Sequence, residues 1–90
     1  DDLVFIDGYP GKYVILARKS QGKWYVTGIN AQKETLKIKT TLPMLESGSY
    51  VTQYSDDESL NGSVERVKIN RKQEVTWTIP YNGAQLLVTE

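Results

Sequence analysis

The side chains with the most obvious chemistry in this chain are carboxylates. The acidic run Asp56-Asp57-Glu58 could offer oxygen ligands to a hard cation such as calcium. It lacks the alternating Asp-x-Asp-x-Asp-Gly spacing of a calcium loop, so a solvated surface loop is the favoured interpretation. Hydrolysis by paired carboxyl groups needs two acids at a fixed separation across a cleft. Nothing in the sequence pairs Asp7, Glu46, Asp56 or Glu65. We therefore predict neither a catalytic site nor a metal site in this chain.

Composition narrows the remaining chemistry. The chain has no Cys and no His, which removes thiolate nucleophiles, disulfides and the commonest general base and metal ligand. Lys plus Arg and Asp plus Glu number 11 each, so there is no net field to attract nucleic acid. No apolar run approaches the roughly 18 residues of a membrane-spanning helix, and no glycine-rich phosphate loop occurs. We expect no cofactor, no nucleic-acid partner and no membrane insertion.

Aromatic side chains are the other group that could bind a ligand, by stacking on sugar rings. Tyr9 and Tyr81 fall in turn-forming sequences and are the candidates for exposed sugar contacts. Trp77 alternates in phase with Val75 and Ile79, which predicts a core position. Four further aromatics of the expected strands are interpreted as core or cross-strand packing. These are Trp24, Tyr25, Tyr50 and Tyr54.

The elements that must position these side chains are short β-strands. Turn residues separate the strands, and no helical pattern is present. The expected strands are 3–6, 13–17, 24–29, 35–42, 49–55, 64–69, 75–79 and 84–88. About eight strands at such spacing predict a small antiparallel β-sandwich, immunoglobulin-like or of a similar two-sheet architecture. Ninety residues suit a single domain, 1–90, and the first residues are typical of a piece excised from a longer protein.

The stretch KYVILARKSQGKWYVTGIN, residues 12–30, predicts a hairpin around which the rest is organised. Its turn contains Gly22, which can adopt a positive φ. Both strands are apolar on both faces, whereas the sheets of a free sandwich usually alternate apolar and polar residues. We therefore predict that the outer face of the hairpin is covered, either by a long loop of this chain or by another domain. The residues assigned to that interface are Val14, Leu16, Trp24 and Tyr25.

The same hairpin resembles the C-terminal domain of glycoside hydrolase family 97. The resemblance rests on YVILARK at 13–19, a short turn with Gly22-Lys23, and WYVTGIN at 24–30. It extends to FIDG at 5–8 and PGKY at 10–13, to Tyr54-Ser55-Asp56, and to the closing segment 80–87. Asp1-Asp2 is similar to the two acids of a Trp-Asp-acid element that precedes the entry strand in the family. Gln85 departs from the pattern, since the family often has an aromatic or small residue there.

The resemblance implies a division of labour within a longer enzyme. Family 97 enzymes are calcium-dependent α-glucosidases or α-galactosidases with an N-terminal β-sandwich and a central (β/α)8 barrel. Their catalytic carboxylates and calcium ligands belong to those earlier domains, so none is carried over to this chain. The resemblance implies a non-catalytic accessory domain that packs against and stabilises the barrel of a periplasmic or secreted parent. The alternatives are a carbohydrate-binding module that uses Tyr9 or Tyr81, and a generic protein-interaction sandwich.

Overall fold

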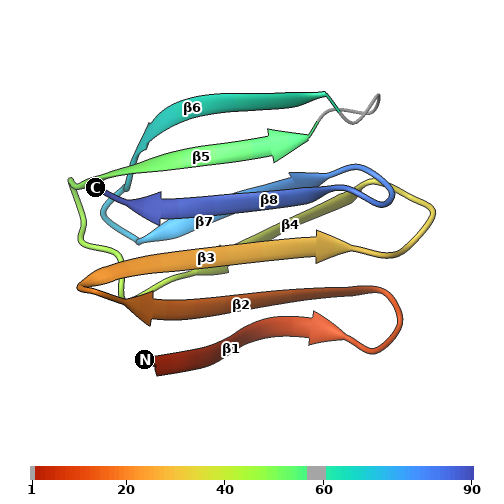
Figure 1. Cartoon of the computed structure of the whole chain (residues 1–90), viewed down its shortest axis with the longest axis horizontal. Coiled ribbons are helices and arrows are strands. Elements are labelled where there is room, and N and C mark those ends of the chain that lie inside the picture. The colour runs from red at the N-terminus through yellow and green to blue at the C-terminus, as the bar shows by residue number, and fades with distance from the viewer. Residues whose placement is uncertain (1, 57–60) are drawn as a thin grey trace.

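The computed structural model describes residues 2–56 and 61–90, which form antiparallel β-strands (Figure 1). The strands are β1 (Asp2–Tyr9), β2 (Tyr13–Ser20), β3 (Lys23–Asn30), β4 (Leu36–Thr41), β5 (Tyr50–Asp56), β6 (Gly62–Lys68), β7 (Glu74–Ile79) and β8 (Ala84–Thr89). The predicted all-β antiparallel fold in two sheets is confirmed. Within these residues, no helix is long and apolar enough to cross a membrane.

The first strand is longer than the sequence predicts. Its turn-forming residues Asp7 and Gly8 were expected to end it after Ile6, but β1 continues to Tyr9. The register between β1 and β2 shifts between Phe5 and Asp7, which is a β-bulge. A bulge absorbs one extra residue, so the strand bends and resumes its pairing instead of ending.

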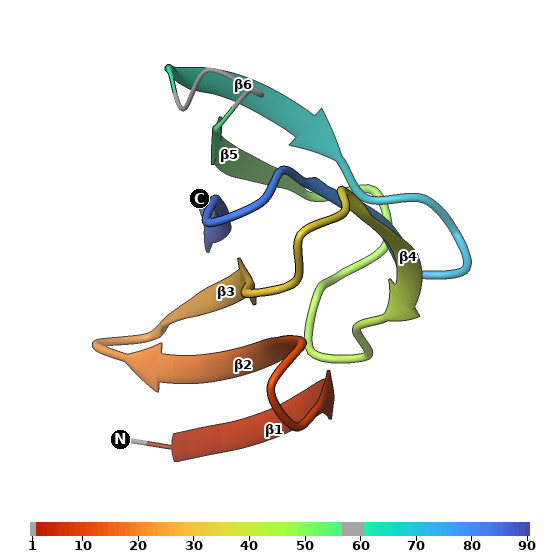
Figure 2. The same cartoon turned by 90° about the vertical axis from the view of Figure 1, so that its right-hand side faces the viewer.

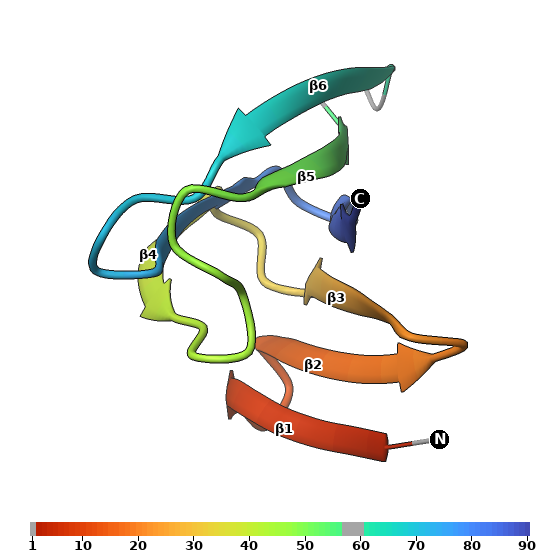
Figure 3. The same cartoon turned by 90° about the vertical axis from the view of Figure 1, so that its left-hand side faces the viewer.

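The two sheets are unequal. The large sheet has the strand order β1-β2-β3-β8-β5-β6, and the small sheet consists of β4 and β7. This six-plus-two division differs from the more even division of an immunoglobulin domain. Figures 2 and 3 show β4 on one side of the large sheet, which curves around it. We call this side of the large sheet its inner face and the opposite side its outer face.

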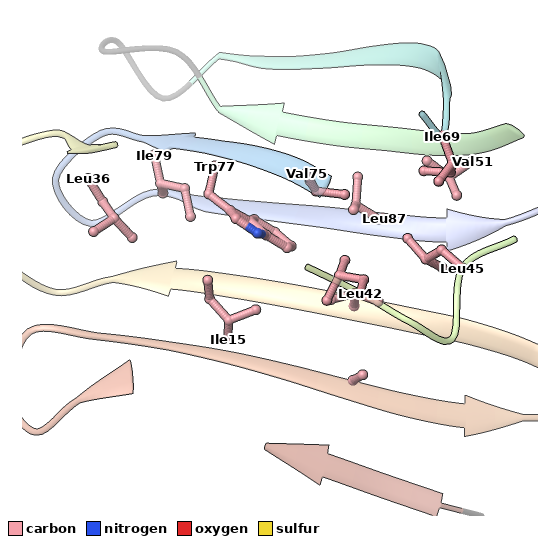
Figure 4. Packing of buried hydrophobic residues seen from close by; sticks show 12 residues of the cluster. Ile15, Leu36, Leu42, Leu45, Val51, Ile69, Val75, Trp77, Ile79 and Leu87 are labelled. Carbon is pink, nitrogen blue, oxygen red and sulfur yellow. The ribbon is translucent and has the colours of Figure 1, made fainter. Parts of the chain in front are cut away.

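The core lies between the inner face and the small sheet (Figure 4). Trp77 of β7 is completely buried, as the alternation predicts, and its indole Nε1 donates a hydrogen bond to Thr40 Oγ1 at 2.8 Å. The buried apolar residues come from both sheets and from the loop after β4. They are Ile15, Ala17, Val26, Leu36, Leu42, Leu45, Val51, Ile69, Val75, Trp77, Ile79 and Leu87.

A two-residue turn fixes the register of the β2–β3 hairpin. Gln21 and Gly22 both have positive φ, 52° and 80°, which defines the type I′ geometry that matches strand twist. The turn places Ile15 opposite Gly28 and Ala17 opposite Val26 on the inner face. The inner face of the hairpin thus belongs to the core, and its outer face remains to be accounted for.

Two buried amides tie the loops and sheets together. Asn30 Nδ2 donates to the carbonyl oxygens of Glu34 and Ile79, each at 2.8 Å, and holds the β3–β4 loop against β7. Gln85 Oε1 accepts from the Thr78 amide at 3.2 Å, and its Nε2 donates to the Thr76 carbonyl at 3.4 Å. The Gln85 side chain therefore satisfies backbone groups of β7 from the large sheet. This is the residue at which the sequence departs from the family pattern.

Candidate docking surface

The outer face is built by cross-strand pairing across the whole large sheet. Residues that pair directly in an antiparallel ladder lie on the same face, so the strand registers align the outward side chains in rows. One row contains Leu3, Arg18, Tyr25, Val88, Thr52 and Arg66. The next contains Phe5, Leu16, Thr27, Leu86, Tyr54 and Val64, and a third contains Val14, Ile29 and Ala84. We call the larger apolar members of these rows the outer-face patch: Leu3, Phe5, Val14, Leu16, Tyr25, Ile29, Tyr54, Val64, Leu86 and Val88.

The outer-face patch is open to solvent in this chain. The side chains of Leu3, Phe5 and Val64 are 68%, 64% and 67% exposed, although all three are large and apolar. Monomeric proteins rarely expose contiguous apolar surface of this kind, and such surface usually marks an interaction site. In Figures 2 and 3, β4 of the small sheet lies on the opposite face, and β7 is paired with β4. Among the described residues, no long loop covers the outer face of the β2–β3 hairpin.

The patch is hollowed, which suits it to accept protruding side chains. A groove of about 400 Å³ runs between Leu3, Tyr25 and Leu86 over the smaller Thr27. A second hollow of about 240 Å³ lies between Tyr54, Leu86 and Val64 over Ala84 and Gly62. Leu86 borders both hollows.

Three of the four residues assigned to an interface from the sequence lie on the outer face. Val14, Leu16 and Tyr25 are there, half-buried among their neighbours. Trp24 lies on the inner face, where it packs against the core. It shares the phase of Val26, and its backbone amide donates to Thr89 Oγ1 at 2.9 Å. Sequence reasoning could not separate Trp24 from Tyr25 because the hairpin is apolar on both sides.

The rest of the outer-face patch was missed at the sequence level. Leu3 and Phe5 of β1, Leu86 of β8, and Tyr54 and Val64 join the hairpin residues only through the strand order. Two signals were available: the unbroken apolar runs LVFI at 3–6 and LLV at 86–88, which are typical of strands covered on both faces. Such runs do not reveal which strands are neighbours.

The two candidate sugar contacts are exposed but do not form one platform. Tyr9 is 59% exposed, lies 4.9 Å from Lys12 Nζ, and lines a hollow of about 330 Å³ with Phe5 and Ile29. Tyr81, in the turn between β7 and β8, is 47% exposed and does not line that hollow. The hollow at Tyr9 is mainly apolar and is continuous with the outer-face patch through Phe5.

A charged cluster borders the patch at its β6 end. Arg66 Nε and Nη2 both donate to the Glu90 carboxylate at 2.9 Å, and the guanidinium lies 3.8 Å from the centre of the Tyr50 ring. The hydrogen bond from Arg66 lowers the pKa of Glu90 below its usual value. A polar rim around an apolar centre is typical of protein interfaces.

Two of the carboxylates considered from the sequence, Asp7 and Asp56, accept hydrogen bonds from nearby protein groups. Asp7 accepts from the Gly8 amide at 2.8 Å and from the Tyr13 hydroxyl at 3.3 Å. Burial and the Asp7 charge raise the pKa of Tyr13. Asp56 Oδ2 accepts from the Ala84 amide at 3.0 Å. Asp57 and Glu58 lie outside the described residues, and within those residues no three acidic side chains gather around a common point.

The comparisons with known proteins now decide the family. The family model "Glycosyl-hydrolase 97 C-terminal, oligomerisation" matches residues 1–87. The chain belongs to this family. The resemblance of the hairpin and of the flanking segments to family 97 is therefore confirmed. No relative among the curated proteins matches the chain.

Solved structures agree with the family assignment. A β-arabinopyranosidase is 38% identical over 99% of this chain, with a TM-score of 0.92. A glycoside hydrolase family 97 enzyme from Pseudoalteromonas sp. strain K8, bound to acarbose, is 17% identical over 98% of the chain, with a TM-score of 0.77. The chain spans 14% and 16% of these two proteins. A family 30 endoxylanase from Clostridium papyrosolvens C71 shares the fold at 18% identity and a TM-score of 0.69, over 98% of this chain and 23% of its own.

Proposed function

We propose that this family 97 C-terminal domain is a non-catalytic accessory domain. Its outer face packs against the catalytic (β/α)8 barrel of its parent glycosidase and stabilises that barrel. The observation that carries this proposal is the outer-face patch, which crosses six strands and has Leu3 and Phe5 largely exposed. The small share of the matched enzymes that the chain spans supports a large neighbouring domain as the occupant. Obligate interfaces are more hydrophobic than transient ones, which agrees with an apolar patch of this extent.

Leu16→Glu in the parent enzyme tests the docking. Leu16 lies on the outer face between Phe5 and Thr27, so a buried unpaired carboxylate there should weaken the docked state. We expect Leu16→Glu to lower the melting temperature of the parent by more than it lowers that of the 90-residue chain alone. The matched control is Thr41→Glu, on an exposed position of the small sheet. A parent whose melting temperature is the same with Leu16→Glu as with Thr41→Glu rules out docking through this face.

For the parent we propose hydrolysis of the glycosidic bond in an α-glucoside, an α-galactoside or a β-arabinopyranoside. The family supports the first two, and the 38% identical β-arabinopyranosidase supports the third.

We also propose that calcium acts in the barrel and that the parent works in the periplasm or outside the cell. A panel of aryl glycosides, assayed with calcium and with a chelator, distinguishes the three substrates. Turnover by the pure 90-residue chain would show that this domain is catalytic.

Carbohydrate binding at Tyr9 is the second candidate function. It is favoured by the exposed Tyr9 ring beside a hollow large enough for a sugar ring. Calorimetric titration of the chain with maltooligosaccharides, α-galactosides and β-arabinopyranosides tests it, with Tyr81→Ala and Tyr9→Ala compared. Saturable heat that Tyr9→Ala abolishes supports a binding module, and no heat at millimolar sugar eliminates it.

A further inference from the structure

The two edge strands of the large sheet differ in where their charged residues lie. The edge strand β6 carries Glu65, Arg66 and Lys68, and charges of this kind discourage edge-to-edge pairing. The edge strand β1 carries the uncharged apolar run LVFI at 3–6, and its two charged residues, Asp2 and Asp7, lie on either side of that run. Asp7 lies beyond the β-bulge, so the short segment before the bulge has no charge of its own and can act as a template for another strand.

The ladder shows which backbone groups of β1 face the open edge. The residues that flank a two-residue type I′ turn form a hydrogen-bonded pair, and such pairs alternate with non-bonded pairs along a hairpin. Counting from the β2–β3 turn, Ala17 directs its N–H and C=O toward β1, where it pairs with Val4. Leu3 and Phe5, on either side of Val4, therefore turn their N–H and C=O groups away from β2, toward the edge.

The template ends at the bulge. Beyond the bulge, the Gly8 amide hydrogen-bonds to Asp7 Oδ1 at 2.8 Å. The register shift between Phe5 and Asp7 also breaks the straight run of the strand. The usable edge is thus the short segment centred on Val4, which is 38% exposed.

We propose that β1 pairs antiparallel with β1 of a second copy of this chain, around a two-fold axis at Val4. In this register, Leu3 of one copy exchanges two backbone hydrogen bonds with Phe5 of the partner subunit. By symmetry, Phe5 of the first copy exchanges two with the partner's Leu3. Val4 faces Val4 of the partner subunit in a non-bonded pair. The large sheets of the two copies then join into one continuous sheet.

The choice of a second copy rests on self-complementarity. Every side-chain pair near this axis is apolar, and aromatic–aliphatic cross-strand pairs are favourable. The corresponding pairing of β6 about Glu65 or Arg66 sets like charges opposite each other. The family's description as an oligomerisation domain agrees with a second copy. This edge is perpendicular to the outer face, so the inference goes beyond the proposed docking and does not depend on it.

Val4→Cys tests both the contact and its register. The chain has no cysteine, and directly opposed residues of a non-bonded antiparallel pair have Cα atoms about 4.5 Å apart, within disulfide range. We expect mild oxidation to cross-link Val4→Cys into dimers at least about tenfold faster than Val64→Cys, a control on the other edge strand with an exposed side chain. Leu3→Cys should also cross-link slowly, because its opposite residue is Phe5 of the partner subunit. Equal rates for Val4→Cys and Val64→Cys overturn the proposal.

Sedimentation of the 90-residue chain gives an independent test. Val4→Lys sets two ammonium groups against each other at the axis, and Val64→Lys is the matched control. We expect the wild type and Val64→Lys to dimerise as concentration rises, and Val4→Lys to remain monomeric. A monomeric wild type at all concentrations overturns the edge contact. Loss of the dimer in Leu16→Glu but not in Val4→Lys assigns self-association to the outer face and also overturns the β1 edge contact. Failure of the docking proposal, by contrast, appears only in the melting temperature of the parent.

Discussion

The Trp77 indole lies directly against the α-carbon of Gly28. A Cβ added at residue 28 would come within 2.9 Å of Trp77 Cε3 and equally close to Ile79 Cδ1. Gly28 is the glycine of the WYVTGIN motif, and its missing side chain lets the small sheet approach the hairpin. The motif glycine thus serves packing across the two sheets rather than a turn.

Gly28→Ala should destabilise the domain by about 1–3 kcal/mol, because the added methyl group cannot enter without displacing Trp77. Urea unfolding followed by tryptophan fluorescence measures the change. Gly62→Ala is the control, since a Cβ there meets no atom within 4 Å. Equal stability of the two variants would show that the Trp77 ring moves freely away from β3.

Thr40→Val should cost about 1–3 kcal/mol, because it keeps the side-chain volume but leaves the buried Trp77 Nε1 without its acceptor. Thr41→Val, at the exposed neighbouring position, should change the free energy of unfolding by less than about 0.5 kcal/mol. Thermal melts of both variants provide the comparison. A neutral Thr40→Val would contradict the hydrogen bond.

Gln21→Asn should stabilise the domain by about 0.5–1 kcal/mol. Gln21 adopts φ 52°, a left-handed conformation that Asn tolerates better than Gln. Gln21→Thr should shift stability the other way, because β-branched residues are disfavoured at positive φ. If the type I′ turn forms in solution, the denaturant midpoint is highest for Gln21→Asn, intermediate for the wild type and lowest for Gln21→Thr.

The Arg66–Glu90 pair should respond to acid. Hydrogen bonding from Arg66 lowers the pKa of Glu90 in the folded chain, so its contribution to stability is present above the usual value of 4.5 and is lost as pH falls through the lowered pKa. We expect wild type to melt slightly above Glu90→Gln at pH 7 and the difference to vanish in stronger acid. A difference that persists once Glu90 is protonated would contradict this assignment.

The sequence predicted the strands and the fold class because turn residues and alternation are local signals. Trp77 could be assigned to the core because Val75 and Ile79 share its phase. The face of Trp24 could not be assigned, since an apolar neighbour on either side removes the alternation that distinguishes inside from outside. The strand order was beyond reach for another reason: pairing between β3 and β8 joins segments more than fifty residues apart, and their local sequences carry no record of it.

The extent of the outer-face patch shows the same limit. Val14 and Leu16 were recognisable within one hairpin, whereas Leu86 and Tyr54 join them only because β8 lies between β3 and β5. Gln85 looked like a departure from the family pattern at a strand position. Its role became visible only when Thr76 and Thr78, on the other sheet, were placed beside it.

The central place of β8 bears on how the domain is made. The segment β1–β3 and the hairpin β5–β6 have no direct pairing with each other, and β8 alone joins them in the large sheet. During synthesis, both pieces leave the ribosome before the strand that unites them. Because domains generally fold as units and non-local strand pairing is slow, the sheet stays in two parts until residues 84–89 emerge. Nascent chains are therefore most exposed to proteases and to wrong edge pairing just before β8 emerges.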